Sequence, residues 1–402
     1  MNCSNPTLCE KKDRPWFRRH RFLALFLLNL VLLVGFLAIC EIGLRVFAPE
    51  WLLSRMDFLA TGAAPEDFGT DRSWKTVKYN DRFVSFRPNS SMDVIHAEYR
   101  TTAKMDDLGG RKLEPQAKSL GEFIVCLGDS FTFGVGVENG ETFVDHLQRE
   151  NTARFLNLGV PGSALTSQRF IVEKRHSELD QPPLYFQFFF LGNDFEDILK
   201  ASRSSPNPQR ETSNPLPDES GWRKFSYKVN QFVNVSWLRY SYVTQFAKRV
   251  IMQATGDKRK NPLYEIMNID SLHYHEKVRD ALDSEIKKWK DLAREKDFRL
   301  VIVFVPDHYQ LDGEMRRHQG KYYGIDCDKL DPLLPNQILS NCLDEQQIPY
   351  IDPIGDWIEL SDRDIRELYY VNDNHFTAKG HFRFAEAIAD EVKAAIKTSP
   401  SE

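Results

Sequence analysis

A chain of 402 residues, of which 42% are aliphatic, aromatic or cysteine, is long enough to bury a complete hydrophobic core and too apolar for a disordered protein. Its six scattered cysteines exclude a disulfide-dense scaffold and a four-cysteine metal site. The formal net charge of -5 offers no strongly basic surface, so we do not expect nucleic acid as a partner.

The first predicted element is a transmembrane helix over residues 22–47. The apolar run FLALFLLNLVLLVGFLAIC has Asn29 as its one strongly polar side chain, and apolar residues continue to Phe47. About 20 apolar residues in a helix cross a bilayer, where only a helix satisfies its own backbone. Six Lys and Arg residues precede the run, which places residues 1–21 in the cytoplasm and the rest of the chain outside it. A cleaved signal peptide is the alternative, although no A-x-A site follows.

Beyond the helix, the composition divides the chain into two parts. Residues 48–120 are turn-rich and without sustained periodicity, which predicts a stalk and lead-in arm. In residues 121–398, short apolar runs alternate with helical patterns, as is typical of a parallel sheet with helices on both faces. The expected strands are 123–127, 154–158, 184–191, 299–305 and 349–353, and the expected helices are 141–150, 167–179, 270–296, 336–347 and 378–396.

A long interruption, residues 195–270, separates the third expected strand from the helix that follows it. It is rich in Ser, Asn, Pro and aromatic residues. Connections of that length usually carry function or are flexible, so we expect a cap over the strand ends. Its aromatic side chains favour packing over a sugar-binding platform, because buried aromatics normally serve cores.

Polar groups follow three of the expected strands. The first strand ends in Gly128-Asp129-Ser130, where the glycine permits a tight turn and the serine presents a hydroxyl, so Ser130 is the candidate nucleophile. A serine at that point is also a common helix cap. Gly162, after the second strand, offers an unobstructed backbone N–H or simply a turn. Asn193, after the third, offers an amide donor for an oxyanion or a cap for the next segment.

A fourth group lies just before the last expected helix, in the block VNDNHFT of residues 371–377. Histidine titrates near neutrality, so His375 is suited to take the serine proton and return it to a leaving group. A neighbouring carboxylate would fix the histidine tautomer and stabilise the imidazolium. His375 is therefore the candidate general base.

We expect no metal and no cofactor. His273 and His275 have no partner at the spacing of a metal site. The glycines of GDSFTFGVG form neither a G-x-G-x-x-G nor a G-K-[ST] phosphate loop, so nucleotide binding is not favoured. Cys327 and Cys342 are the two cysteines that look able to pair, with two free thiols as the alternative.

In this order the blocks resemble the SGNH or GDSL hydrolase superfamily, whose members are esterases, lipases and acyl-sugar deacetylases, with some acyltransferases. The matching residues are GDS at 128–130, N-x-G-x-x-G at 157–162, N-D at 193–194 and a terminal block with Asp373 and His375. The resemblance covers roughly 122–396. It implies a three-layer α/β/α, flavodoxin-like SGNH hydrolase fold with a five-stranded parallel sheet.

The resemblance also implies roles for single residues. Ser130 would be the nucleophile and His375 the base. The oxyanion hole would consist of the N–H groups of Ser130 and Gly162 and the side chain of Asn193. Leu191 departs from the leading glycine of the family's G-x-N-D block, which predicts a reshaped pocket near Asn193.

The acid of the terminal block has two candidates. The commonest family pattern is D-x-x-H, but the residue three before His375 is Asn372, and Asp373 lies two before it. Because some branches of the family use D-x-H, Asp373 is assigned as the orienting acid, with Asn372 as the alternative.

The sequence thus predicts a membrane-anchored serine hydrolase that cleaves small-molecule or carbohydrate acyl esters through an acyl-enzyme on Ser130. An O-acyltransferase acting on an envelope or secreted polysaccharide is the first alternative. A non-catalytic ligand-binding module on the same scaffold is the second, because a fold does not by itself establish a function.

Overall fold

The computed structural model describes residues 21–47, 76–79, 82–95, 98–114, 123–203, 241–244, 246–247, 262–323, 325–370 and 373–397. Its centre is a five-stranded sheet in which all neighbouring strands are parallel. The strands are β5 (Phe123–Leu127), β6 (Arg154–Asn157), β7 (Leu184–Phe190), β8 (Arg299–Val305) and β9 (Tyr350–Ile351). Their order across the sheet is β6-β5-β7-β8-β9, or 2-1-3-4-5 in chain order, which is the flavodoxin-like arrangement and confirms the predicted fold class.

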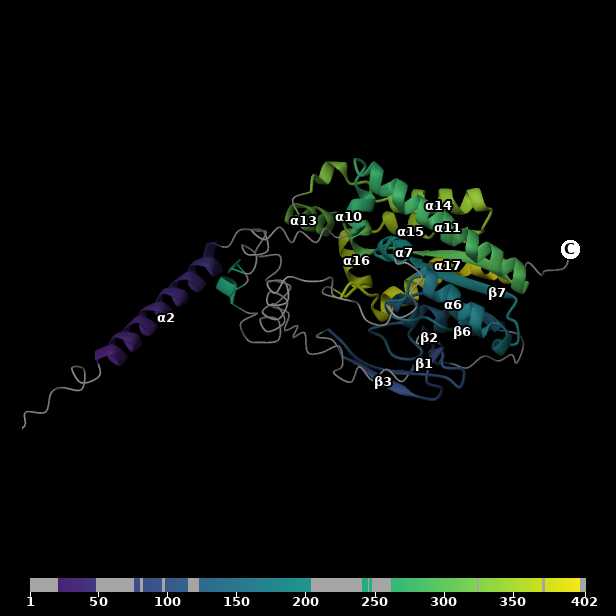
Figure 1. Ribbon diagram of the computed structural model, residues 1–402, viewed down its shortest axis with the longest axis horizontal. Helices are drawn as coiled ribbons and strands as arrows, with labels where there is room; N and C mark the ends of the chain where they lie inside the picture. Colours follow the sequence, from purple (N-terminus) through teal and green to yellow (C-terminus); the bar gives the residue numbers. More distant parts are fainter. Residues whose placement is uncertain are drawn as a thin grey trace, which may run out of the picture.

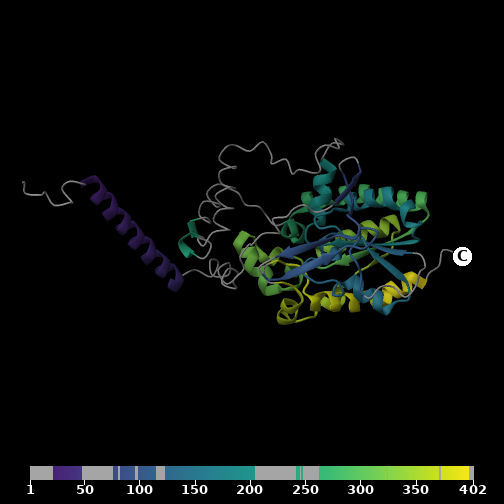
Figure 2. The same ribbon diagram turned by 90° about the horizontal axis from the view of Figure 1, so that it is seen from below.

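Helices cover both faces of this sheet. Alternate residues of each strand point to opposite faces, and they belong to two different hydrophobic clusters. Figure 2 shows the two helical layers on opposite sides of the strands. One layer contains α6 (Leu165–Arg175), α7 (Asp194–Arg203), α10 (Pro262–Met267), α11 (Leu272–Lys296) and α14 (Leu334–Gln346). The other contains α4 (Ser130–Phe133), α5 (Phe143–Glu150), α12 (His308–Leu311), α15 (Ile354–Ile358), α16 (Asp362–Leu368) and α17 (Ala378–Lys397).

The longest helix of the first layer shows why these segments fold as they do. The buried residues of α11 include Val278, Leu282, Ile286 and Trp289, which recur at the three- and four-residue spacing of one helix face. Asp297, the residue after the helix, adopts a left-handed backbone with φ of 56°, and its N–H donates to the carbonyl of Ala293. The periodic face thus packs on the sheet, and the left-handed residue turns the chain into β8.

The described part of residues 48–120, expected as a stalk and lead-in arm, contains four strands. β1 (Thr76–Tyr79) pairs with β2 (Arg82–Phe86), and β3 (Ser91–Ile95) pairs with β4 (Arg100–Lys104), both antiparallel. Phe86, Tyr99, Ala103 and Met105 form a hydrophobic cluster with residues that follow β5. We call the described part of residues 82–114 the ribbon segment. It packs on the domain at the β6 edge of the sheet, where Arg111 bridges Asn157 (Figure 1).

Arg111 fastens the ribbon segment to the domain. Its buried guanidinium donates to the carbonyl oxygens of Phe133 at 3.1 Å, Gly134 at 2.7 Å and Val137 at 2.6 Å. Burial lowers the pKa of Arg111 to about 10, so the group stays a cation near neutral pH. Through these three hydrogen bonds, Arg111 holds the ribbon segment against the turn that follows α4.

The expected interruption at 195–270 is ordered into the core at both ends. Phe195, Ile198 and Leu199 of α7 and Leu263 and neighbouring residues of α10 belong to the same hydrophobic cluster as α11. These two ends are therefore part of the domain. The aromatic residues between 222 and 240, on which the predicted cap depends, lie outside the described residues.

The N-terminal element α2 (Arg21–Phe47) has the expected bounds to within one residue. It is 27 residues long, and its most apolar 18-residue window has a mean hydropathy of 2.9 and is not buried, so the helix is long and apolar enough to span a membrane. A signal sequence would satisfy the same test. Near the end of α2, the carboxylate of Glu41 accepts hydrogen bonds from the Ser241 hydroxyl and from the N–H groups of Tyr242 and Val243.

Candidate active site

Ser130 lies at the end of β5, where the chain turns sharply into the short helix α4. A Cβ at Gly128 would overlap the side chain of Thr132 and lie 3.1 Å from the carbonyl oxygen of Phe188, so this position requires glycine. The cap of α4 is Asp129, whose Oδ1 accepts the Phe131 N–H at 2.9 Å. Because Asp129 takes the capping role, the Ser130 hydroxyl is available for another bond.

That hydroxyl bonds to His375 and begins a chain of three side chains. Ser130 Oγ lies 2.7 Å from His375 Nε2, and His375 Nδ1 lies 2.7 Å from Asp373 Oδ2. The side chains of His375 and Asp373 are 17% and 8% exposed, so the pair is largely shielded from water. With the proton on Nδ1 donated to Asp373, Nε2 accepts the serine O–H, which is the arrangement in which a serine is activated as a nucleophile.

A tight loop before α17 presents His375. Tyr370 N–H donates to the His375 carbonyl at 2.8 Å, and Asn374 adopts a left-handed backbone with φ of 60°. The Asn374 side-chain amide donates to Asp307 Oδ2 at 3.0 Å, which ties the loop to the end of β8. Asn372, the alternative acid-position residue, lies outside the described residues.

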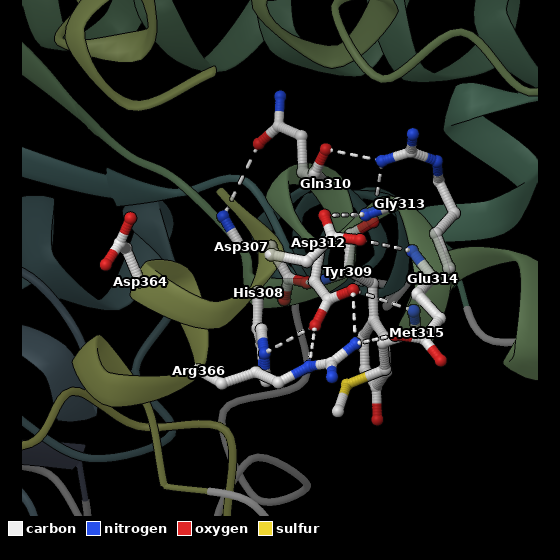
Figure 3. A network of polar contacts seen from close by, with 12 residues as sticks. Asp307, His308, Tyr309, Gln310, Asp312, Gly313, Glu314, Met315, Asp364 and Arg366 are labelled. Carbon is white, nitrogen blue, oxygen red and sulfur yellow. Dashed lines mark hydrogen bonds and ion pairs between the residues drawn. The ribbon is translucent and has the colours of Figure 1, made fainter. Parts of the chain in front are cut away.

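A polar network anchors the far side of this loop (Figure 3). Asp307 caps α12 through the Tyr309 N–H at 2.7 Å, and burial raises the pKa of Asp307 to about 6. The fully buried Asp312 accepts Arg366 Nε at 2.6 Å, which holds α16 against α12. Asp307 also accepts the Asn374 amide, so this network is connected to the loop that carries His375.

Gly162 belongs to a loop that lies on the Ser130 turn. Val160 N–H and the Ser163 hydroxyl both bond to the Gly128 carbonyl, at 2.9 Å and 3.1 Å. A Cβ at Gly159 would lie 2.7 Å from the carbonyl carbon of Thr132, so this glycine allows the loop to approach α4. Gly162 has φ of +72°, and a Cβ there would meet no heavy atom within 4 Å. The position of a side chain at Gly162 is therefore open space.

Asn193 follows β7, the neighbour of β5 in the sheet, so it lies at the same strand ends as Ser130. Its Nδ2 donates one hydrogen to Asp197 Oδ2 at 2.9 Å, which leaves the second amide hydrogen for another acceptor. Leu191, which stands where the family's G-x-N-D block has glycine, donates its N–H to the Val305 carbonyl at 3.0 Å. Its side chain is fully buried in the cluster beneath α7, where it extends the core.

Two further carboxyl groups lie buried at these strand ends. Asp194 Oδ2 accepts the Phe190 N–H at 3.0 Å, and burial together with the charge of Asp129 raises the pKa of Asp194 well above its ordinary value. Burial also raises the pKa of Asp129 to about 6, against the opposing effect of His375. Burial and the neighbouring Asp129 therefore both favour the neutral form of Asp194.

Sequence reasoning missed two residues that contact Asp373. The Tyr99 hydroxyl donates to Asp373 Oδ2, and Glu98 Oε2 accepts the Asp373 N–H at 3.1 Å. Both come from the ribbon segment, in which neither a motif nor a periodicity marks them. Only the folded chain brings residues 274 positions apart into contact.

Within the described ranges, no group of three or more His, Cys, Asp or Glu side chains is placed to hold a metal ion. Cys327 and Cys342 are both free thiols, so the structure takes the second of the two alternatives for this pair. Cys327 is partly exposed, and its thiol donates to the Arg317 carbonyl at 3.5 Å. Cys126 and Cys342 are buried.

No family model matches the chain, and no curated protein matches it. Several solved structures are similar. A member of the lipolytic G-D-S-L family from Veillonella parvula is 16% identical with a TM-score of 0.35, covering 67% of this chain and 97% of that chain. An acetylxylan esterase from Geobacillus stearothermophilus is 12% identical with a TM-score of 0.32, covering 68% of this chain and 94% of that chain. TesA is 10% identical with a TM-score of 0.36, covering 68% and 99%.

Proposed function

We propose that the protein is an SGNH-type serine hydrolase that cleaves carboxylic ester bonds through an acyl-enzyme on Ser130. The hydrogen-bond chain from Ser130 through His375 to Asp373, with 2.7 Å at each step, is the observation that carries the proposal. A nucleophile, a base and an orienting acid in that sequence are what acyl transfer to serine requires.

In the proposed reaction, Ser130 Oγ attacks the ester carbonyl while His375 Nε2 takes its proton. Asp373 holds Nδ1–H and stabilises the imidazolium that forms. The same Nε2 proton then passes to the leaving alcohol, and an acyl-serine remains. Water, activated by the neutral imidazole, attacks the acyl-serine and releases the acid, which restores the serine hydroxyl.

The oxyanion that forms in each step needs preorganised donors. We assign these to the N–H groups of Ser130 and Gly162 and to the Asn193 amide. The open backbone at Gly162 and the second hydrogen of the Asn193 amide support this assignment. Loss of one such donor typically costs a few kcal/mol of transition-state stabilisation.

We further propose that α2 anchors the chain in a membrane, with the basic residues 1–21 in the cytoplasm and the hydrolase domain outside it. The assigned domain, 121–398, would then act on small-molecule or carbohydrate acyl esters in the periplasm or outside the cell. The exposed apolar helix α2 and the basic residues that precede it support this arrangement.

Labelling with a fluorophosphonate probe tests the proposal, because the probe reacts covalently with activated serines. The wild-type chain should be labelled and should hydrolyse a p-nitrophenyl acyl ester, and Ser130→Ala should lose both. Ser340→Ala, on the surface of α14, is the matched control and should retain both. Labelling of Ser130→Ala at the wild-type rate, or a folded wild type that is never labelled, would refute the proposal and favour a non-catalytic module.

A further inference from the structure

The carboxylate of Asp373 receives a second donor besides His375. His375 Nδ1 lies 2.7 Å from Asp373 Oδ2, and the Tyr99 hydroxyl donates to the same oxygen. A carboxylate oxygen has two lone pairs and accepts two such bonds. The chain of polar side chains therefore continues past its acid and ends in the ribbon segment.

Packing holds Tyr99 in this position. The side chain is 8% exposed and belongs to the cluster that the ribbon segment forms with Phe133. Its ring lies 4.8 Å from that of Tyr370, whose hydroxyl donates to the Gly136 carbonyl at 2.7 Å. A Cβ at Gly136 would lie 2.7 Å from the Tyr370 ring and 3.1 Å from the Tyr99 ring, so glycine leaves room for both. These contacts pack the Tyr99 ring beside Tyr370 and Gly136.

We propose that Tyr99 is a positioning residue of the active site: its hydroxyl holds the Asp373 carboxylate in the orientation that receives the Nδ1–H of His375. This inference rests on the proposed function and adds to it a requirement for the ribbon segment. Without the hydroxyl, Asp373 Oδ2 loses the bond from Tyr99, and the carboxylate is held less firmly in its orientation toward His375.

Other ionisable groups surround the pair. Glu98 accepts the Asp373 N–H, Tyr370 contacts the Tyr99 ring, and the charge of His375 acts to lower the pKa of Asp129. Burial, followed by the charge of Asp373, raises the pKa of Tyr99 far above its ordinary value, so its hydroxyl remains a donor throughout the working pH range. None of these groups replaces the bond that Tyr99 donates to Oδ2.

The first test is the Tyr99→Phe variant, which keeps the ring and removes the bond. We expect kcat to fall about tenfold to a hundredfold with KM unchanged, because the loss concerns a charged acceptor in the catalytic chain. The acid limb of the pH profile should move to higher pH, because a carboxylate with fewer donors attracts the His375 proton more strongly. A change in packing alone would not move that limb.

Tyr185→Phe is the matched control. It removes the hydroxyl of a buried tyrosine that bonds to His176 at 2.9 Å, near the start of β7, at the end opposite the site. We expect wild-type kcat and an unchanged pH profile for this variant. A melting temperature for each variant establishes that it is folded under the assay conditions.

A double-mutant cycle separates direct action on Asp373 from any other effect. In an Asp373→Asn background, Tyr99→Phe should lower the fluorophosphonate labelling rate by less than threefold, because its target is already lost. An equal loss in both backgrounds, or a folded Tyr99→Phe variant with the wild-type rate and pH profile, would overturn the inference while the hydrolase proposal stands. A folded wild type without labelling overturns both.

Discussion

Asp373 orients the base of the proposed mechanism. We expect Asp373→Asn to lower the rate of fluorophosphonate labelling by about three to four orders of magnitude, because the asparagine favours the wrong histidine tautomer. Asn372→Ala should retain at least half of the wild-type rate. The measurement is the second-order labelling rate of the two variants beside the wild type. A large loss in Asn372→Ala and none in Asp373→Asn would mean that Asn372, and not Asp373, orients His375.

We expect Arg111 to contribute to the free energy of unfolding. Its guanidinium is the donor to the carbonyls of Phe133, Gly134 and Val137. In Arg111→Met, these buried carbonyls lose that donor, so we expect the free energy of unfolding to fall by about 3 to 5 kcal/mol. Urea unfolding measures the change.

The control for this prediction is Arg383→Met, which removes an exposed ion pair with Glu386 on α17. It should change the free energy of unfolding by less than about 0.5 kcal/mol, as is usual for surface pairs. Equal effects of the two substitutions would mean that the ribbon segment contributes no more to stability than a surface charge does.

At the scale of elements, the carboxyl group of Asp307, just after β8, connects α12 to the loop that carries His375. Burial raises the pKa of Asp307 from 3.8 to about 6, so the folded protein favours its neutral form. The unfolded chain ionises first as pH rises, and stability is lost between about pH 4 and pH 6. At about 1.4 kcal/mol per pH unit, the loss amounts to roughly 3 kcal/mol.

Asp307→Asn removes this ionisation. We expect the variant's free energy of unfolding, measured relative to wild type, to improve by roughly 3 kcal/mol between pH 4 and pH 7.5. Urea unfolding at both pH values gives the difference. Asp390→Asn, at an exposed position of α17, should show no comparable trend. A constant difference between Asp307→Asn and wild type would show that the carboxyl is ionised throughout.

The elements that the sequence predicts well are those with a continuous apolar signal. β5 and β8 have the predicted bounds because their residues are buried on both faces and read as unbroken apolar runs. The predicted strand 349–353 shortens to Tyr350–Ile351, since the prolines at both ends have no N–H to donate to the ladder. The helix predicted over 270–296 begins two residues later, at Leu272.

The elements that were missed lack that signal. In β4, Thr101 and Ala103 are the buried positions, and small or polar residues give no apolar alternation. α10 has six residues, too few for a helical period. The candidate site divides in the same way: its serine, glycine, asparagine and histidine stand in recognisable blocks, whereas Tyr99 reaches Asp373 only through tertiary packing.

At the scale of the whole molecule, the proposal that α2 is a membrane anchor can be tested directly. We expect the full-length chain to remain in the membrane fraction after extraction with alkaline carbonate. Leu30→Arg combined with Leu33→Arg should release it, because each arginine near the helix centre costs about 3 kcal/mol of insertion. Immunoblotting of pellet and supernatant gives the measurement.

The control for this experiment is Leu30→Ile with Leu33→Ile, which leaves the helix apolar and should leave the chain in the membrane. The intact mass of the protein distinguishes an anchor from a cleaved signal peptide. A mass that lacks the first 40 or so residues would replace the anchor by a signal peptide.

The contact between Tyr99 and Asp373 has a consequence for biosynthesis. The two residues are 274 positions apart, and the acid and the base both lie within the last thirty residues of the chain. Synthesis proceeds from the N-terminus, so the ribbon segment and the serine emerge long before the residues that would activate that serine. On the proposed mechanism, a nascent chain is therefore unable to attack esters on its way to its final location, and a chain that ends before Asp373 stays inert.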